Sequence, residues 1–258
     1  MATAPWFVIS PNTALSLIGL LRGPDRTVPT PPEDWHNAVV DVVIPAFREQ
    51  DNILYTLTSV MRQSFPPRQV ILVDDGGKDA TVSRARAFAE ANGLKMTVIE
   101  RASSIGKTPT IKRQAREFDS DVEFILDGDT FLENDNYIER CVQELYQGAG
   151  IASACGTILP MRFKDRDLMA DSPPFRRYLG SQPYHDPFRD KTGLQRLWWW
   201  ITNIYRDHLY KFLQRFVYVG QMTFFGGITN PVGCAVAYRR KYIKDLFDRY
   251  EPLFGDDL

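Results

Sequence analysis

The chain contains 258 residues, of which 44% are hydrophobic and 12% aromatic, so it can bury the core of an ordinary globular protein. Its 31 basic and 32 acidic residues leave a formal net charge of -1, which argues against a nucleic-acid binder that works through bulk positive charge. Three scattered cysteines and three scattered histidines exclude a disulfide framework and a zinc site built from clustered ligands.

Residues 1–38 are predicted to be an N-terminal segment and linker. The apolar run at 14–21 is far shorter than the roughly 20 residues that cross a bilayer, so no transmembrane helix is predicted. A helix over 12–21 would instead suit a membrane surface. No basic segment with a small-residue cleavage site marks a secretory signal. The prolines within 22–37 indicate an irregular linker.

From residue 39 onward, short apolar runs alternate with helical periodicity. In chain order the pattern predicts a strand at 39–45, a helix near 50–63, a strand at 69–75, a helix near 79–92, a strand at 95–100, a helix near 107–117 and a strand at 122–129. This alternation is typical of an α/β fold with a Rossmann-like, mostly parallel central sheet and helices on both faces. Ligands bind such sheets beyond the carboxyl ends of the strands.

The second half of the chain is less regular. A helix is predicted near 135–147 and a strand near 151–159. Residues 162–191 are rich in proline and charge, and we expect a long loop there, either a functional lid or a disordered segment. Residues 233–240 (GCAVAYRR) predict a buried strand followed by a basic helix start.

Residues 194–220 predict one long apolar helix. Most of its large side chains form one helical stripe: Leu194, Leu197, Trp198, Ile201, Ile204, Tyr205, His208, Phe212, Phe216 and Val219. Trp199, Trp200, Tyr210 and Leu213 lie off this stripe. Two interpretations stay open: the helix is part of the core, or it lies at a bilayer surface, where interleaved basic residues would face the headgroups.

Acidic residues stand at the predicted strand ends. Glu49 follows the first strand, Asp75 ends the second, and Asp127 and Asp129 end the fourth. Carboxylate pairs suit Mg²⁺ or Mn²⁺, which bind through one or two carboxylates together with substrate phosphates. Lys107 follows Gly106 at a predicted helix start, where its charge and the free helix amides would together meet a phosphate.

The usual nucleotide and hydrolase motifs are absent from the sequence. No G-x-G-x-x-G follows the first strand, where PAFREQ stands instead. Gly106 and Lys107 lack the upstream glycine of a P-loop, because Arg101 occupies that place. Neither G-x-S-x-G nor H-E-x-x-H occurs.

The order and spacing of the remaining motifs resemble the inverting family 2 glycosyltransferases with the GT-A fold. The matching stretches are VVIPAFREQDNILYTLTSVMRQSFPPRQVILVDDGGKDAT (42–81), GKTPTIKRQA (106–115), FILDGDT (124–130), NPVGCAVAYRR (230–240) and FGDDL (254–258). The resemblance assigns 39–258 to a GT-A catalytic domain. The family commonly has Asn at Arg48, Ser at Gly77 and an Asn where Lys112 and Arg113 stand, which bears on substrate choice.

The resemblance implies roles for individual residues. Asp129 and Asp127 would hold Mg²⁺ or Mn²⁺, and Gly233 and Cys234 would lie near the acceptor sugar. The nucleotide donor would contact these residues: Pro45, Ala46, Glu49, Asp75, Lys107 and Asp127. An inverting transfer also needs a base on the acceptor side, and the family's general-base motif corresponds to Asp257, with Asp256 orienting it or binding the acceptor.

The predicted function is therefore metal-dependent, inverting sugar transfer from a nucleotide-diphosphate donor, UDP-linked by resemblance, to a carbohydrate or lipid-linked acceptor. Two alternatives stay open: a sugar-1-phosphate nucleotidyltransferase, and a non-catalytic module that binds a sugar nucleotide. Many membrane-bound polysaccharide synthases of this family continue into a Q-x-x-R-W segment and transmembrane helices, so we expect a chain truncated at its C-terminus. The expected location is the cytoplasmic side of a membrane, peripherally or as the soluble domain of a longer protein, and no nucleic-acid partner is expected.

Overall fold

The computed structural model describes residues 33–148, 150–190, 192–225, 227 and 233–249, together with Ala14, Leu17, Ile18 and Leu21. The predicted base Asp257 and its neighbour Asp256 lie outside these residues. The chain forms two compact units. The sheet unit comprises Pro29–Gly156, Arg162–Asp190 and Val232–Leu258, and the helical unit comprises Met1–Val28, Thr157–Met161 and Lys191–Pro231.

The described part of the sheet unit contains a six-stranded sheet in the order β3-β2-β1-β4-β6-β5. Four strands are parallel: β1 (Val40–Ala46), β2 (Gln69–Asp74), β3 (Met96–Glu100) and β4 (Val122–Leu126). β6 (Ala235–Arg239) pairs antiparallel with β4, and with the short strand β5 (Ser153–Cys155) on its other side. The mostly parallel α/β sheet predicted from the sequence is therefore confirmed.

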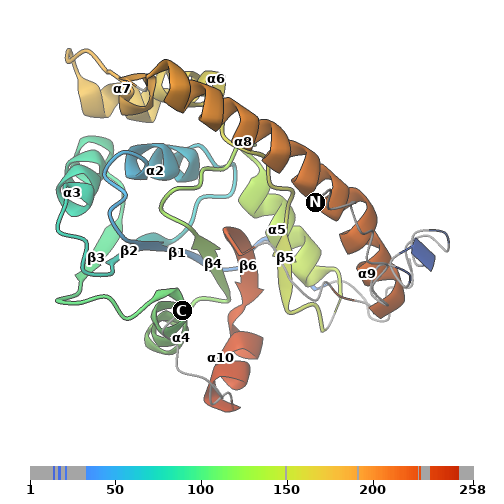
Figure 1. Cartoon of the computed structure of the whole chain (residues 1–258). Helices are drawn as coiled ribbons and strands as arrows, with labels where there is room; N and C mark the ends of the chain where they lie inside the picture. Colours follow the sequence, from blue (N-terminus) through green and yellow to red (C-terminus); the bar gives the residue numbers. More distant parts are fainter. Residues whose placement is uncertain are drawn as a thin grey trace, which may run out of the picture. The chain divides into compact units, whose positions relative to one another are not determined.

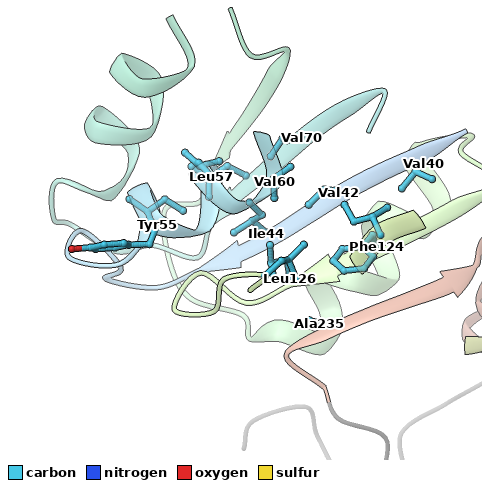
Figure 2. Close-up of a cluster of buried hydrophobic side chains, with 14 of the residues drawn as sticks. Val40, Val42, Ile44, Tyr55, Leu57, Val60, Val70, Phe124, Leu126 and Ala235 are labelled. Carbon is cyan, nitrogen blue, oxygen red and sulfur yellow. The ribbon is translucent and has the colours of Figure 1, made fainter. Parts of the chain in front are cut away.

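Helices cover both faces of this sheet (Figure 1). On one side lie α2 (Ile53–Met61), α3 (Thr81–Asn92) and α5 (Tyr137–Tyr146), and on the other lie α4 (Lys107–Glu117) and α10 (Arg240–Arg249). Successive strand residues point to opposite faces. Val42 and Ile44 therefore join a core with Leu57 and Phe124 (Figure 2), whereas Val43 packs into a smaller cluster on the opposite face.

The prediction of a long loop at 162–191 is wrong. This segment forms α6 (Phe163–Ala170), α7 (Pro173–Leu179) and a short 3-10 helix, η1 (Pro187–Asp190). Arg162 and Asp165 form a capping box at the start of α6, and proline at the first position of α7 suits a helix start. Buried Phe175 packs against Tyr55 of α2 with the ring centroids 5.3 Å apart, so the segment is part of the core.

The helical unit is dominated by α8 (Gly193–Phe212), which continues into a π-helix, η2 (Leu213–Tyr218), and then α9 (Val219–Phe225). No residue of α8 is buried, and Trp198 is 62% exposed. The interpretation of this stripe as core is therefore wrong for the described helix. Among the residues that the structure covers, no helix has the length and apolar character needed to cross a bilayer.

Candidate active site

The carboxyl ends of β1, β2 and β4 lie at one edge of the sheet, where backbone hydrogen bonds join the end of β2 to β1 and the end of β4 to the segment before β6. The amide of Asp75 donates to the carbonyl of Ala46 at 2.8 Å, and the amide of Asp127 donates to the carbonyl of Cys234 at 2.9 Å. Pro45 is half-buried and Ala46 buried at the end of β1. The sequence-predicted residues within the described ranges therefore come from neighbouring positions in the fold.

The turn after β4 presses closely against the loop after β1. A Cβ at Gly128 would lie 2.9 Å from Cγ of Glu49 and 3.2 Å from Cβ of Ala46, so only glycine fits without movement. Thr56 on α2 donates its hydroxyl to the Gly128 carbonyl at 2.9 Å. Glu49 consequently lies beside the turn that carries Asp127 and Asp129.

Lys107, the first residue of α4, ion-pairs with Asp127 and donates from Nζ to the carbonyl of Gly233 at 2.7 Å. One ammonium group thus connects the start of α4, the end of β4 and the segment before β6. Burial raises the pKa of Asp127, Lys107 opposes this shift, and the charge of Asp129 adds to it. Lys107 therefore holds positive charge where an acidic ligand would approach.

Glu49 is half-buried and faces several like charges. Burial raises the pKa of Glu49, a hydrogen bond from Asn52 opposes that shift, and the charges of Asp129, Asp79 and Asp127 add to it. Placing carboxylates where they repel one another costs free energy, and a bound cation relieves that cost.

The carboxylate pair Asp127 and Asp129 fits Mg²⁺ or Mn²⁺ held jointly with phosphate oxygens. Within the described ranges, no group of three or more His, Cys, Asp or Glu side chains could enclose a metal ion. These two cations commonly bind through one or two carboxylates and take further oxygen ligands from substrate phosphates and water. Asp129 is exposed and Asp127 half-buried, so this arrangement remains accessible to a phosphorylated ligand.

Asp75 occupies a different environment, which the sequence did not reveal. Its carboxylate accepts hydrogen bonds from Arg101 Nη1 at 2.8 Å, from the Ser104 hydroxyl, and from the amides of Ile105 and Gly106 at 3.0 and 2.9 Å. Burial alone would raise the pKa of Asp75, but these bonds lower it to about 2. Asp75 therefore secures the loop that leads into α4.

Arg101 is the main residue that sequence reasoning missed. Its side chain is only 8% exposed, and it forms a salt bridge with Asp75. In the sequence it served only to reject a P-loop, although its position directly after β3 places it at the same sheet edge as Asp75. An arginine immediately after a predicted strand was the available signal.

The two predicted acceptor residues contact the site mainly through their backbones. Gly233 is exposed and supplies the carbonyl that binds Lys107, and half-buried Cys234 supplies the carbonyl that binds the Asp127 amide. Burial raises the pKa of the Cys234 thiol to about 11, so it is uncharged at neutral pH and unsuited to nucleophilic attack.

Comparison with known proteins identifies a family. The sequence model of the family described as glycosyl transferase family 2 matches residues 41–247 of this chain. The chain is 30% identical over 99 residues to dodecaprenyl-phosphate galacturonate synthase of Rhizobium johnstonii, a match that covers 37% of this chain and 29% of the relative. It is 19% identical over 217 residues to an uncharacterized glycosyltransferase of Haemophilus influenzae, covering 80% of this chain and 64% of that protein.

A third relative and a solved structure extend the similarity. Undecaprenyl-phosphate 4-deoxy-4-formamido-L-arabinose transferase of Serratia proteamaculans is 30% identical over 93 residues, covering 35% of this chain and 28% of its own. Mannosyltransferase PcManGT of Pyrobaculum calidifontis, solved with GDP-Man and Mn²⁺, has a TM-score of 0.50 and 20% identity, covering 61% of this chain and 46% of its own. This chain thus matches less than two thirds of the length of each of these four proteins.

Proposed function

The chain belongs to glycosyl transferase family 2 and is a glycosyltransferase with a GT-A fold, and from that premise we propose which substrates it uses. The proposed donor is a nucleotide-diphosphate sugar, UDP-linked, and the proposed acceptor is a carbohydrate or a lipid-linked group. The names of two relatives, a dodecaprenyl-phosphate galacturonate synthase and an undecaprenyl-phosphate 4-deoxy-4-formamido-L-arabinose transferase, support a lipid-linked acceptor.

The observation that carries this proposal is the meeting of Lys107, Asp127, Asp129 and Glu49 at the carboxyl edge of the sheet. Lys107 and the free amides at the start of α4 would bind the donor diphosphate. Asp127 and Asp129 would hold Mg²⁺ or Mn²⁺, whose charge stabilises the leaving diphosphate when the ion is bound. Glu49, together with the end of β1, would contact the nucleoside.

The proposed base is Asp257, oriented by Asp256. In an inverting transfer the acceptor hydroxyl attacks the anomeric carbon as the bond to the diphosphate breaks, and the hydroxyl proton passes to a carboxylate on the acceptor side. Asp127 and Asp129 are committed to the leaving-group side and cannot serve. Replacing Asp257 with Asn keeps its size but removes its basicity, so transfer should slow by roughly 10²- to 10⁴-fold while nucleotide affinity stays unchanged.

A donor screen tests the proposed chemistry. The chain would be incubated with UDP, GDP, CMP and dTDP sugars, with and without Mn²⁺, and both its thermal stability and the release of nucleotide would be measured. Metal-dependent release of UDP from one sugar donor supports the proposal. Formation of a sugar nucleotide from a nucleoside triphosphate would favour a nucleotidyltransferase, and binding without turnover would favour a non-catalytic module.

We also propose that α8 contacts a membrane on its cytoplasmic side. Trp198 and Trp200 are 62% and 58% exposed, and exposed basic residues such as Arg196 and Arg206 share the same helix. Exposed aromatic and basic side chains suit the interface of an anionic bilayer.

Flotation with anionic vesicles tests this contact. The double variant Trp198→Ser, Trp200→Ser should lose vesicle binding, yet its stability should change by no more than about 0.5 kcal/mol because both side chains are exposed. Leu168→Ser is the matched control, since Leu168 is 61% exposed on α6. Retained vesicle binding by the double variant, or unfolding of it, would overturn the membrane contact.

A further inference from the structure

Arg166 on α6 is a buried cation that the proposed chemistry does not use. Its side chain and that of Asp186 are each 3% exposed and form a salt bridge of 2.8 Å. Its guanidinium carbon lies over two aromatic rings, 4.1 Å from the centroid of Tyr55 and 4.4 Å from that of Phe188. Nη2 also donates to the carbonyl of Asp51 at 3.0 Å. Contacts from several directions fix the orientation of this group.

One guanidinium nitrogen points toward the candidate active site through Asn52. Arg166 Nη1 donates to Asn52 Oδ1 at 3.1 Å, and Asn52 Nδ2 donates to Glu49 Oε2 at 2.9 Å. Because arginine can only donate, the Asn52 oxygen must face Arg166, and its amide nitrogen is then left to face Glu49. Glu49 in turn packs against the position of Gly128 in the acidic turn.

This chain of contacts joins the segment that the sequence misread as a loop to the donor side of the site. α6 and α7 lie on the same side of the sheet as α2, whose N-cap residue is Asn52 (Figure 1). Burial of the Arg166 ion pair needs only Asp186 for charge balance. The additional bond to Asn52 specifies the direction in which the Asn52 amide, and through it the Glu49 carboxylate, is presented.

We propose that Arg166 is a positioning residue for the nucleotide donor, acting through Asn52 to orient Glu49. The inference rests on the proposed function, because it assumes that Glu49 contacts the nucleoside. The segment 162–190 then contributes to donor affinity without touching the donor. Second-layer contacts of this kind commonly decide whether a binding carboxylate is held in its productive orientation.

A double-mutant cycle tests whether Arg166 acts through Asn52. The variants are Arg166→Lys, Asn52→Leu and the combination, and the measurement is the dissociation constant of UDP with Mn²⁺ by calorimetry on the full chain. Lysine can still reach Asp186 but lacks the fork that also reaches Asn52. Each single variant should weaken UDP binding about tenfold. The double variant should bind UDP no more weakly than either single variant, because both substitutions interrupt the same path from Arg166 through Asn52 to Glu49.

Arg189→Lys is the matched control, since Arg189 lies in the same segment but pairs with Asp167 at the surface, and it should leave UDP affinity unchanged. Unchanged affinity in both single variants, or losses that multiply to about a hundredfold in the combination, would overturn the inference. A merely structural role would lower thermal stability and would not produce this non-additivity.

A further variant keeps the inference testable if Arg166→Lys fails to fold. Asn52→Asp retains an oxygen for Arg166 but turns a second oxygen toward Glu49, so UDP binding should weaken about tenfold. Wild-type affinity in Asn52→Asp would overturn the inference. A wild-type chain that binds no nucleotide would overturn the proposed function itself, whereas intact binding with an uncoupled cycle overturns only the role of Arg166.

Discussion

The carboxyl ends of β2 and β4 both carry aspartates, but the surroundings of these carboxylates differ. Asp75 is 9% exposed, and its oxygens are taken by Arg101, a hydroxyl and two loop amides. Asp127 is 26% exposed and shares its neighbourhood with Asp129 and Glu49, with Lys107 as its counter-charge. The first acid is saturated by its own chain and secures a loop, whereas the second retains capacity for a ligand.

The same substitution at the two strand ends should have unequal effects on stability. Asp75→Asn leaves Arg101 without its negative partner in a buried site, which should lower the free energy of unfolding by about 3 kcal/mol. Asp127→Asn removes an ion pair but also relieves repulsion, so its change should stay within about 1 kcal/mol. Denaturant unfolding of both variants measures the difference, and equal losses would show that the two acids serve alike.

The response to Mn²⁺ should depend on the acidic turn at the carboxyl end of β4. Saturating UDP at 100 times its dissociation constant stabilises a protein by about 2.7 kcal/mol, and Asp129→Ala should abolish the Mn²⁺-dependent part of that stabilisation. Thermal shift with UDP, with and without Mn²⁺, provides the measurement. Asp119→Ala is the control, because Asp119 is an exposed acid in a similar Asp-Ser-Asp triplet. Persistent Mn²⁺ dependence in Asp129→Ala would remove this pair from the metal site.

The difference between the two strand ends also marks how far sequence reasoning reached. The parallel strands and the start of α4 at Lys107 followed from apolar periodicity and a Gly-Lys pair, which are local signals. The saturation of Asp75 depends on Ser104 and Arg101, which are distant in sequence and meet it only when β2 and β3 pair. Periodicity cannot reveal such long-range bonds.

The prediction of a loop for segment 162–190 was wrong for a related reason. Its prolines and charges are typical of a loop, yet Pro173 begins α7 and Arg166 is buried through Asp186 and two aromatic rings. A buried charge can be predicted from sequence only if its partner is known, and the partners of Arg166 lie 20 or more positions away from it. Asp257 and Asp256 lie outside the described residues, so the roles predicted for them stay predictions.

Acid titration should separate the two strand ends by sign. Because the pKa of Asp75 is lowered to about 2, its stabilising bonds are fully present above its ordinary pKa and are lost as pH falls through about 2. The stability gap between wild type and Asp75→Asn should therefore shrink by about 2 kcal/mol as the pH falls from neutral to 2. A stability gap that stays constant as the pH is lowered would contradict the role of Asp75.

At the carboxyl end of β4, burial raises the pKa of Asp127. Protons should therefore compete with Mn²⁺ for this carboxylate, and metal affinity should increase with pH.

Glu123, at the opposite end of β4 from Asp127, isolates the effect of burial. It is 2% exposed, and no hydrogen bond to its Oε1 is present in the described part of the chain. Burial raises the pKa of Glu123 to about 8, Arg240 opposes this shift and Asp41 adds to it.

The folded state therefore holds a proton on Glu123 that the unfolded state releases, and the stability of the wild type must fall as pH rises toward and through 8. Glu123→Gln keeps the neutral shape at every pH, so its stability relative to wild type should be higher at pH 9 than near pH 5 by about 4 kcal/mol. Denaturant unfolding at both pH values measures this, with Glu90→Gln, exposed on α3, as the control. A Glu123→Gln variant that is no more stable at pH 9 than at pH 5, relative to wild type, would mean that the buried carboxyl finds a partner when it ionises, and burial would then not explain the behaviour of Asp127 either.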